Sequence, residues 1–251
     1  MIFALLFFCQ IGWGAFEPSP LEDPIPFKRT DSPHLTIGYE DLGGMVGYTY
    51  LNLTDGSHGI SLRSSGDREG LYRELSIRYA EHLTLNGVKL ILSPSFLSCS
   101  ARGDLGEVGI GRGFSLDIGV GWNMRSVRAE TIAIGLIGGI RYNRHALKRA
   151  EAKSYWERPG GNLIFKLTIP IERISGGVKM GIWNRNPFLY LQTEPIGRSS
   201  LEAGWISGEG ARGGFRFGLK ADLGDFYLRY RHLIGRSGMQ SVAFDITVKV
   251  R

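Results

Sequence analysis

Cysteine, long apolar runs and helical periodicity are all scarce in this chain of 251 residues. Its two cysteines, Cys9 and Cys99, lack the spacing of a metal site. Cys9 falls in a short apolar run of leader type, so a mature chain would hold one cysteine and no intrachain disulfide. Mean hydropathy is -0.07, which excludes a protein that crosses a membrane with helices. It does not exclude one whose strands are apolar on one face only.

Clusters of residues that carry catalysis or bind metals are also missing. The histidines are scattered along the chain as His34, His58, His82, His145 and His232. Ser57 and His58 cannot pair directly, because adjacent residues of a strand point to opposite faces. A barrel protease or phospholipase needs a Ser–His or Asp–His pair, and a metal needs clustered His, Cys or carboxylates. We therefore expect no enzymatic activity, no catalytic residue, no metal and no cofactor.

A glycine-rich stretch covers residues 98–113 and interrupts the predicted strands. Within it, Gly109-Ile110-Gly111 superficially resembles a nucleotide-binding loop. A phosphate cradle needs a helix N-terminus directly after the glycines, but residues 114–123 alternate strictly between apolar and small or polar side chains. We therefore expect neither a nucleotide site nor a nucleic-acid partner.

Strict alternation is what the chain has in abundance, above all in its last forty residues. The strands predicted over 212–222, 225–234 and 239–250 are joined by very short turns. In the last of them Val242, Phe244, Ile246 and Val248 alternate with polar or small residues, so one face is apolar and the other charged. Soluble strands average only about five or six residues. These strands are close to the ~9–11 residues that a tilted strand needs to cross a bilayer.

The same pattern recurs along the chain and predicts an all-β fold. Further strands are predicted over residues 34–40, 45–53, 59–65, 71–80, 84–92, 114–123, 131–142, 162–171, 177–183, 188–193 and 199–207. Residues 71–80 also fit helical spacing. The longest polar interruption, 143–161, is basic and would face outside the cell. We predict a single antiparallel transmembrane β-barrel of about 12–14 strands over residues 34–251.

The N-terminal region predicts export. Residues 1–15 form a short apolar run that ends in small residues, as a signal peptide does, with cleavage after Gly14 or Ala15. Residues 16–33 are rich in proline, which removes ladder donors. This segment is predicted to be either a linker or a plug inside the barrel. The predicted location of the mature protein is the outer membrane.

Inward-facing charges are the candidate ligand-binding residues. They are Arg216, Lys220, Arg229, Arg231, Asp245 and Lys249, on three consecutive predicted strands that would share one lumen wall. Asp117, Arg141, Lys166 and Glu202 could face them from other strands. One interpretation is a salt-bridged network that fills the interior, because unpaired buried charge is costly. The other is an anion-favouring pore or a site for a phosphate-bearing ligand, in keeping with the net charge of +6.

Three short motifs resemble a known group of bacterial outer-membrane barrels. They are Leu71-Tyr72-Arg73-Glu74, Gly181-Ile182-Trp183-Asn184 followed by Pro187, and Phe226-Tyr227-Leu228-Arg229-Tyr230-Arg231. The chain is similar in these motifs to the group that joins FadL-type transporters of hydrophobic compounds with the PorV and PorQ secretion proteins. That resemblance implies a passive channel or carrier for a small or lipidic molecule, or a scaffold of an envelope complex. Outer-membrane lipid and other envelope or secretion proteins would be its partners. The alternative is a soluble, secreted all-β binding protein.

Overall fold

The computed structural model describes residues 32–103, 106–124, 127–144, 153–157, 162–171, 176–183, 186–193, 198–208, 213–236 and 238–250. The predicted signal peptide and nearly all of the predicted linker lie outside these ranges. The strands are β1 His34–Leu42, β2 Val46–Thr54, β3 His58–Asp67, β4 Tyr72–Leu85, β5 Val88–Gly103, β6 Gly106–Met124, β7 Val127–Arg144, β8 Lys153–Glu157, β9 Asn162–Ile171, β10 Gly176–Trp183, β11 Asn186–Thr193, β12 Ser199–Ile206, β13 Gly214–Asp222, β14 Phe226–Gly235 and β15 Gln240–Lys249. No helix within the described ranges is long and apolar enough to span a membrane.

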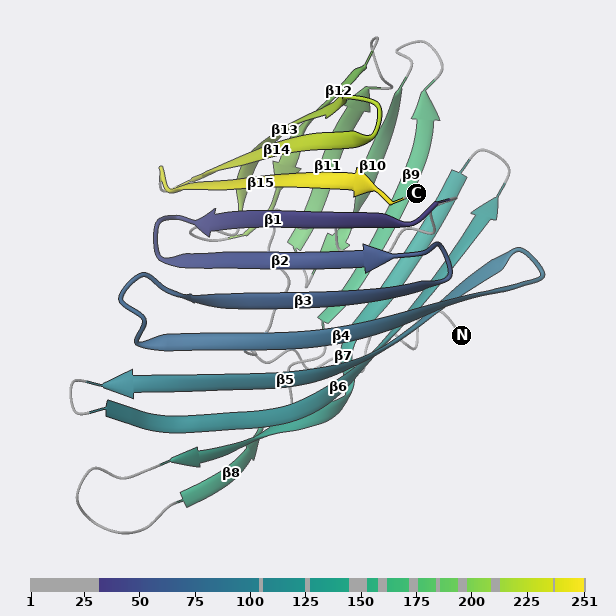
Figure 1. The fold of residues 1–251 in the computed structure, drawn as a ribbon. Helices are drawn as coiled ribbons and strands as arrows, with labels where there is room; N and C mark the ends of the chain where they lie inside the picture. The colour runs from purple at the N-terminus through teal and green to yellow at the C-terminus, as the bar shows by residue number, and fades with distance from the viewer. Residues whose placement is uncertain are drawn as a thin grey trace.

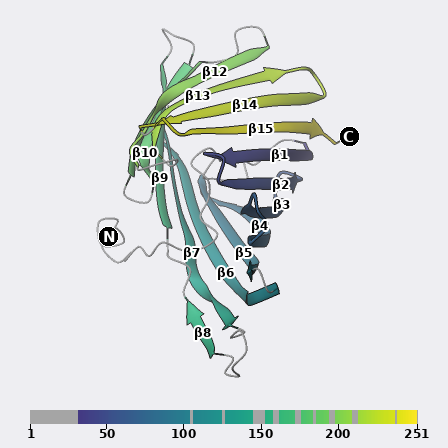
Figure 2. The ribbon, with the colours of Figure 1, turned by 90° about the vertical axis from the view of Figure 1, so that its left-hand side faces the viewer.

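Fourteen of the strands close into a ring. The strands from β1 to β7 pair with one another in sequence order. β1 also pairs with β15, and the strands from β15 back to β9 pair in turn. The pairing of β9 with β7 closes the ring. Figure 1 shows β1 beside β15, and Figure 2 shows β9 beside β7. All pairings are antiparallel, and β8 adds only a short ladder to the far end of β7. The predicted single antiparallel β-barrel is therefore confirmed.

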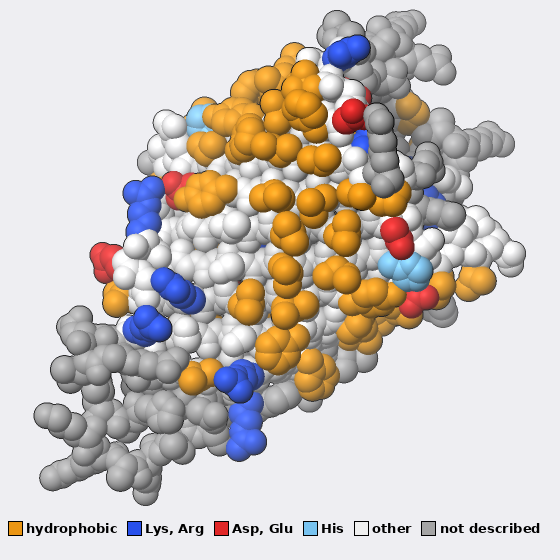
Figure 3. All heavy atoms as spheres, viewed as in Figure 1, with side chains coloured by type: hydrophobic (Ala, Val, Ile, Leu, Met, Phe, Trp, Pro, Cys, Tyr) orange, Lys and Arg blue, Asp and Glu red, His pale blue; other side chains and the backbone are white. Residues whose placement is uncertain are grey.

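The outer face of this ring is apolar. One row of large side chains runs directly from strand to strand as register partners, through Ile246, Ile37, Leu51, Leu62, Ile77, Phe96 and Phe114. Each of these side chains is 36–56% exposed. Figure 3 shows hydrophobic side chains spread over the centre of this face. No second layer of described residues covers this surface, and an apolar outer face of this kind is suited to lipid.

The inner face carries the polar side chains. The buried charged residues are Glu40, Asp117, Glu130, Lys166, Arg216, Arg231 and Asp245, and Ser65, Ser93, Ser95 and Ser115 are buried with them. They occupy the pleats that alternate with the exposed apolar residues. The predicted alternation is thus confirmed, with apolar side chains outside and charged side chains inside.

Two strand predictions are wrong. A strand was predicted over residues 84–92, but β4 ends at Leu85 and β5 begins at Val88. Asn86 and Gly87 between them both have positive φ, 50° and 80°. An Asn-Gly pair of this kind forms the two-residue turn whose twist suits a β-hairpin, so the chain reverses where continuous alternation had suggested one strand.

The glycine-rich stretch 98–113 is the second correction. It was predicted to interrupt the strands, yet β5 continues to Gly103 and β6 starts at Gly106. The two strands pair along almost their whole length, for example at Cys99 and Gly111, with one register shift between Ala101 and Arg102. Pairing with a long neighbour outweighs the low intrinsic strand preference of glycine, because strand preference depends strongly on context.

Candidate functional site in the barrel interior

The predicted ligand-binding residues lie on the inner face of three neighbouring strands. β13 holds Arg216 and Lys220, β14 holds Arg229 and Arg231, and β15 holds Asp245 and Lys249; the three strands pair in this order. Arg231 and Asp245 are only 2% exposed and Arg216 is also buried, whereas Lys220 is exposed and Lys249 half-buried near the end where β15 ends. The structure thus brings the six residues onto one wall and divides it into a buried centre and a rim.

Asp245 is the centre of the buried part. Its Oδ2 lies 2.8 Å from Nη2 of Arg231 and 3.0 Å from Nε of Arg229. The hydroxyl of Tyr50, on β2, donates a hydrogen bond of 3.0 Å to the same oxygen and accepts one of 2.9 Å from Nη2 of Arg231. Sequence reasoning missed Tyr50, because it lies 195 residues before Asp245. The carboxylate thus neutralises part of the charge of two arginines.

Gly38 makes the contact between Tyr50 and Asp245 possible. It lies on β1, between Tyr50 on one side and Asp245 on the other. A Cβ built on Gly38 would be 2.2 Å from Cζ of Tyr50, so the ring lies flat across β1. We call Tyr50, Gly38, Asp245 and Arg231 the closure strap. It crosses the joint between the first and last strands of the barrel.

Gly38→Ala is expected to release the closure strap. The added methyl group would force the ring of Tyr50 away, and its hydroxyl would lose its bonds to Asp245 and Arg231. Leaving these buried groups without that partner should cost about 1–3 kcal/mol of unfolding free energy, measured by urea unfolding in lipid vesicles.

The matched control is Gly47→Ala. Gly47 lies in the same hairpin, and a Cβ there would be 3.4 Å from the hydroxyl oxygen of Tyr39, a contact that a small shift can relieve. In a protein that already carries Tyr50→Ala, Gly38→Ala should lower the unfolding free energy little further. If Gly38→Ala lowered it equally with and without the ring of Tyr50, the closure strap would be contradicted.

A second arrangement of the same kind lies on β10–β13. Arg216 Nη2 is 2.9 Å from Oε1 of Glu202, and Lys179 Nζ is 3.8 Å from Oε2 of the same carboxylate. The guanidinium carbon of Arg216 also lies 4.9 Å from the ring centroid of Tyr190. That ring lies across Gly204, where a Cβ would be 2.4 Å from its Cδ1. Aromatic rings therefore reach a charged residue two strands away by crossing a glycine.

Three of the further predicted charges do not join the wall formed by β13, β14 and β15, which we call the C-terminal wall. Lys166 pairs with Glu130 at 2.7 Å, across the joint between β9 and β7. Asp117 pairs with Arg78 at 3.2 Å on another part of the inner face. Arg141 is wrongly predicted as inward: it is exposed on the outer face. The alternation of β7 is weak, so its pairing with β6 and β9 decides which pleat faces inward.

Glu202 is the further charge that does reach the C-terminal wall, and with Asp245 it leaves that wall positive. Each carboxylate is shared by two basic side chains. At the rim, the ammonium groups of Lys220 and Lys249 lie 4.2 Å and 4.9 Å from the ring centroid of Tyr227. A cation held over an aromatic face keeps its charge, so the rim adds two positive charges to the wall, and Asp222 and Asp225 lie near that of Lys249.

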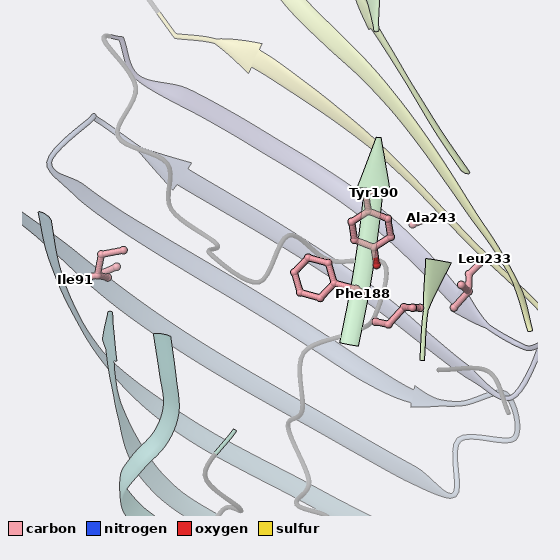
Figure 4. Close-up of a cluster of buried hydrophobic side chains, with 7 residues drawn as sticks. Ile91, Phe188, Tyr190, Leu233 and Ala243 are labelled. Atoms are coloured by element: carbon pink, nitrogen blue, oxygen red, sulfur yellow. The ribbon is translucent and has the colours of Figure 1, made fainter. Parts of the chain in front are cut away.

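Buried apolar side chains accompany the charges. They are Ala80, Ile91, Phe188, Tyr190, Ile206, Leu233 and Ala243. The rings of Phe188 and Tyr190 stack with their centroids 5.2 Å apart, and Figure 4 shows them on β11. Single inward apolar residues in otherwise polar strands carry no distinct sequence signal, so this cluster was not predicted. The described residues contain no group of three or more His, Cys, Asp or Glu side chains placed to hold a metal ion.

Comparison with solved structures supports the barrel fold. No family model and no curated protein matches the chain. Among solved structures, the "CymD monoaromatic hydrocarbon channel" aligns with a TM-score of 0.56 and 9% identity over 88% of this chain and 89% of that chain. This chain therefore shares its β-barrel fold with that structure. A structure of the KdgM porin in complex with disordered oligogalacturonate aligns with a TM-score of 0.42 and 8% identity, over 87% of this chain and 99% of the porin.

Proposed function

We propose that this protein is a passive outer-membrane channel for small molecules and performs no chemistry on them. One observation carries the proposal: fourteen strands close into a ring that is apolar outside and charged inside. Lipid suits the outer face and water or a polar solute suits the inner face. The shared fold with a monoaromatic hydrocarbon channel supports this role.

The connections between strands support an orientation for the barrel. At the end where β1 begins and β15 ends, the turns are short, such as 55–57 between β2 and β3 and 86–87 between β4 and β5. The opposite end holds the longer connections, 145–161 between β7 and β9, which includes β8, and 207–213 between β12 and β13. Barrels of this class have short periplasmic turns and longer external loops. We therefore place the start of β1 and the end of β15 on the periplasmic side.

The inner wall supports a preference for anions. Arg229 is 34% exposed and Lys220 is exposed on the inner face, so both can meet a passing solute. The buried Arg216 and Arg231 add positive potential behind them. Rings or walls of one charge select ions of the opposite sign. We propose that a small anionic solute contacts Lys220, Arg229 and Lys249, while Arg216, Arg231 and Asp245 lie behind them in the same wall.

Lys220→Gln together with Arg229→Gln is expected to weaken that preference. Each substitution removes a cation that the interior exposes, so the ratio of anion to cation permeability should fall roughly twofold or more. The measurement is the reversal potential in planar bilayers under a salt gradient. Arg73→Gln, on the outer face, is the control and should leave the ratio unchanged. A ratio that is the same in all three proteins would overturn the anion preference, and the absence of conductance in all of them would overturn the channel.

The soluble alternative makes a different prediction for the whole molecule. A barrel embedded in membrane should remain in carbonate-washed envelopes and migrate faster in an SDS gel when it has not been boiled. Release by the wash without a mobility shift would favour the soluble protein.

Two expectations stay predictions from the sequence motifs. One is membership of the FadL, PorV and PorQ group, and the other is a scaffold role with envelope or secretion proteins.

A further inference from the structure

Two arginines face each other on the outside of the barrel. Arg112 of β6 and Arg141 of β7 are direct register partners, and both are exposed. Arg112 shares its face with Phe114, which is 56% exposed and belongs to the apolar row. Arg73 of β4 is also exposed, and it lies one pleat beyond the outward Leu75. We call Arg73, Arg112 and Arg141 the outer arginine site.

This arrangement is unfavourable unless something neutralises it. Like charges directly opposite each other on a sheet destabilise the pair of strands. Within the described part of the chain, no ion pair involves Arg73, Arg112 or Arg141. The carboxylate at this end that does form an exposed pair, Asp41, is 2.9 Å from Arg68 instead. An external anion is therefore the natural partner of the site.

The position of the outer arginine site indicates which anion. The arginines begin where the apolar surface stops, two residues from Phe114 on β6 and two from Leu75 on β4. In Figure 3, Lys and Arg side chains gather beside the hydrophobic surface, toward the lower left. This is the barrel end opposite the start of β1 and the end of β15. If that end faces outward, the arginines lie at the level of the lipid headgroups of the outer leaflet.

We propose that the outer arginine site binds the phosphate groups of a phosphorylated glycolipid in the outer leaflet. This inference rests on the proposed membrane location and orientation. Directly opposed residues of antiparallel strands have their Cα atoms about 5 Å apart, so Arg112 and Arg141 can share one phosphate. Arg73 lies two strands away, roughly 10 Å across the sheet, which suits a second phosphate of the same headgroup. The planar guanidinium group is well matched to phosphate oxygens.

The test is the double variant Arg112→Gln with Arg141→Gln, purified as the full chain in a neutral detergent. The measured quantity is the midpoint temperature at which the fast-migrating folded band disappears. Without lipid, the variant should be at least as stable as the wild type, because the like-charge contact is gone. Bisphosphorylated lipid A should raise the midpoint of the wild type by roughly 2–8 °C and leave that of the variant nearly unchanged.

Three further arms make the result specific. Lipid A without its phosphates should not stabilise the wild type, and Arg198→Gln, an exposed arginine at the terminus end, should respond as the wild type does. Equal responses of wild type and double variant would overturn the site. Full stabilisation by inorganic pyrophosphate alone would overturn the lipid assignment and indicate a site for soluble anions. All variants keep the folded band and the conductance of a channel if the proposed function holds, so failure of the lipid site is distinguishable from failure of the channel.

Discussion

Arg231→Met is expected to lower the unfolding free energy of the barrel by about 3–5 kcal/mol. Arg231 is almost completely buried and lies 2.8 Å from Asp245 and 2.9 Å from the hydroxyl of Tyr50. Removing its charge leaves the buried carboxylate with Arg229 as its remaining cation, at the edge of the interior. Breaking a buried pair on one side is costly because the other charge stays desolvated. The measurement is urea unfolding of the protein in lipid vesicles.

Arg229→Met is the matched control for this prediction. Arg229 bonds the same carboxylate at 3.0 Å but is 34% exposed, so water can take its place. We expect a loss below about 1 kcal/mol. Arg231→Met combined with Asp245→Leu should recover much of the stability, because no buried charge is then left alone. Equal losses for Arg231→Met and Arg229→Met would show that burial of the pair does not decide its energy.

Ile246→Arg is the second change with a large expected effect. Ile246 belongs to the outward apolar row and pairs directly with Ile37 across the joint between β15 and β1. A charged side chain at mid-bilayer depth on the lipid face of a barrel costs roughly 2–4 kcal/mol. The same unfolding measurement in vesicles checks it. The loss arises from lipid contact, so it should shrink if the substituted position lies nearer the membrane surface.

Met45→Arg provides that comparison. Met45 is also an exposed apolar residue, but it lies in the turn between β1 and β2, beyond the apolar row. Its replacement should change stability by no more than about 0.5 kcal/mol. If Ile246→Arg were as harmless as Met45→Arg, the outer face would meet water, and the soluble alternative would replace the membrane assignment.

Alternation between neighbouring residues explains which parts of the fold could be predicted from the sequence. The strands β13, β14 and β15 alternate strictly and are joined by short turns, so their residues, their faces and their mutual pairing all follow from neighbours along the chain. The pairing of these strands brings Arg216, Arg231 and Asp245 onto neighbouring strands of one wall. The turn at Asn86 and Gly87 also has a local signal, because an Asn-Gly pair between two alternating segments is typical of a hairpin turn.

Contacts between strands that are distant in the sequence explain which side-chain positions could not be predicted from it. Tyr50 meets Asp245 only because β1 pairs with β15 in a register that places Gly38 between them. Arg141 faces outward because β7 pairs with β6 and β9 in registers that its own weak alternation does not specify. Small residues on one face of a strand leave both orientations open until the neighbouring strands decide between them.

The sequence by itself determined a chain of amphipathic strands, several of them long enough to cross a bilayer, with charges on the face opposite the apolar one. The period of two and the turn residues are properties of neighbouring residues, so they can be seen without a fold. Closure of the ring decided the rest: which strands meet at the two joints, which carboxylate each arginine reaches, and which arginines are left outside. A barrel closes in one combination of strand number and register, and only that combination brings together residues from opposite ends of the chain.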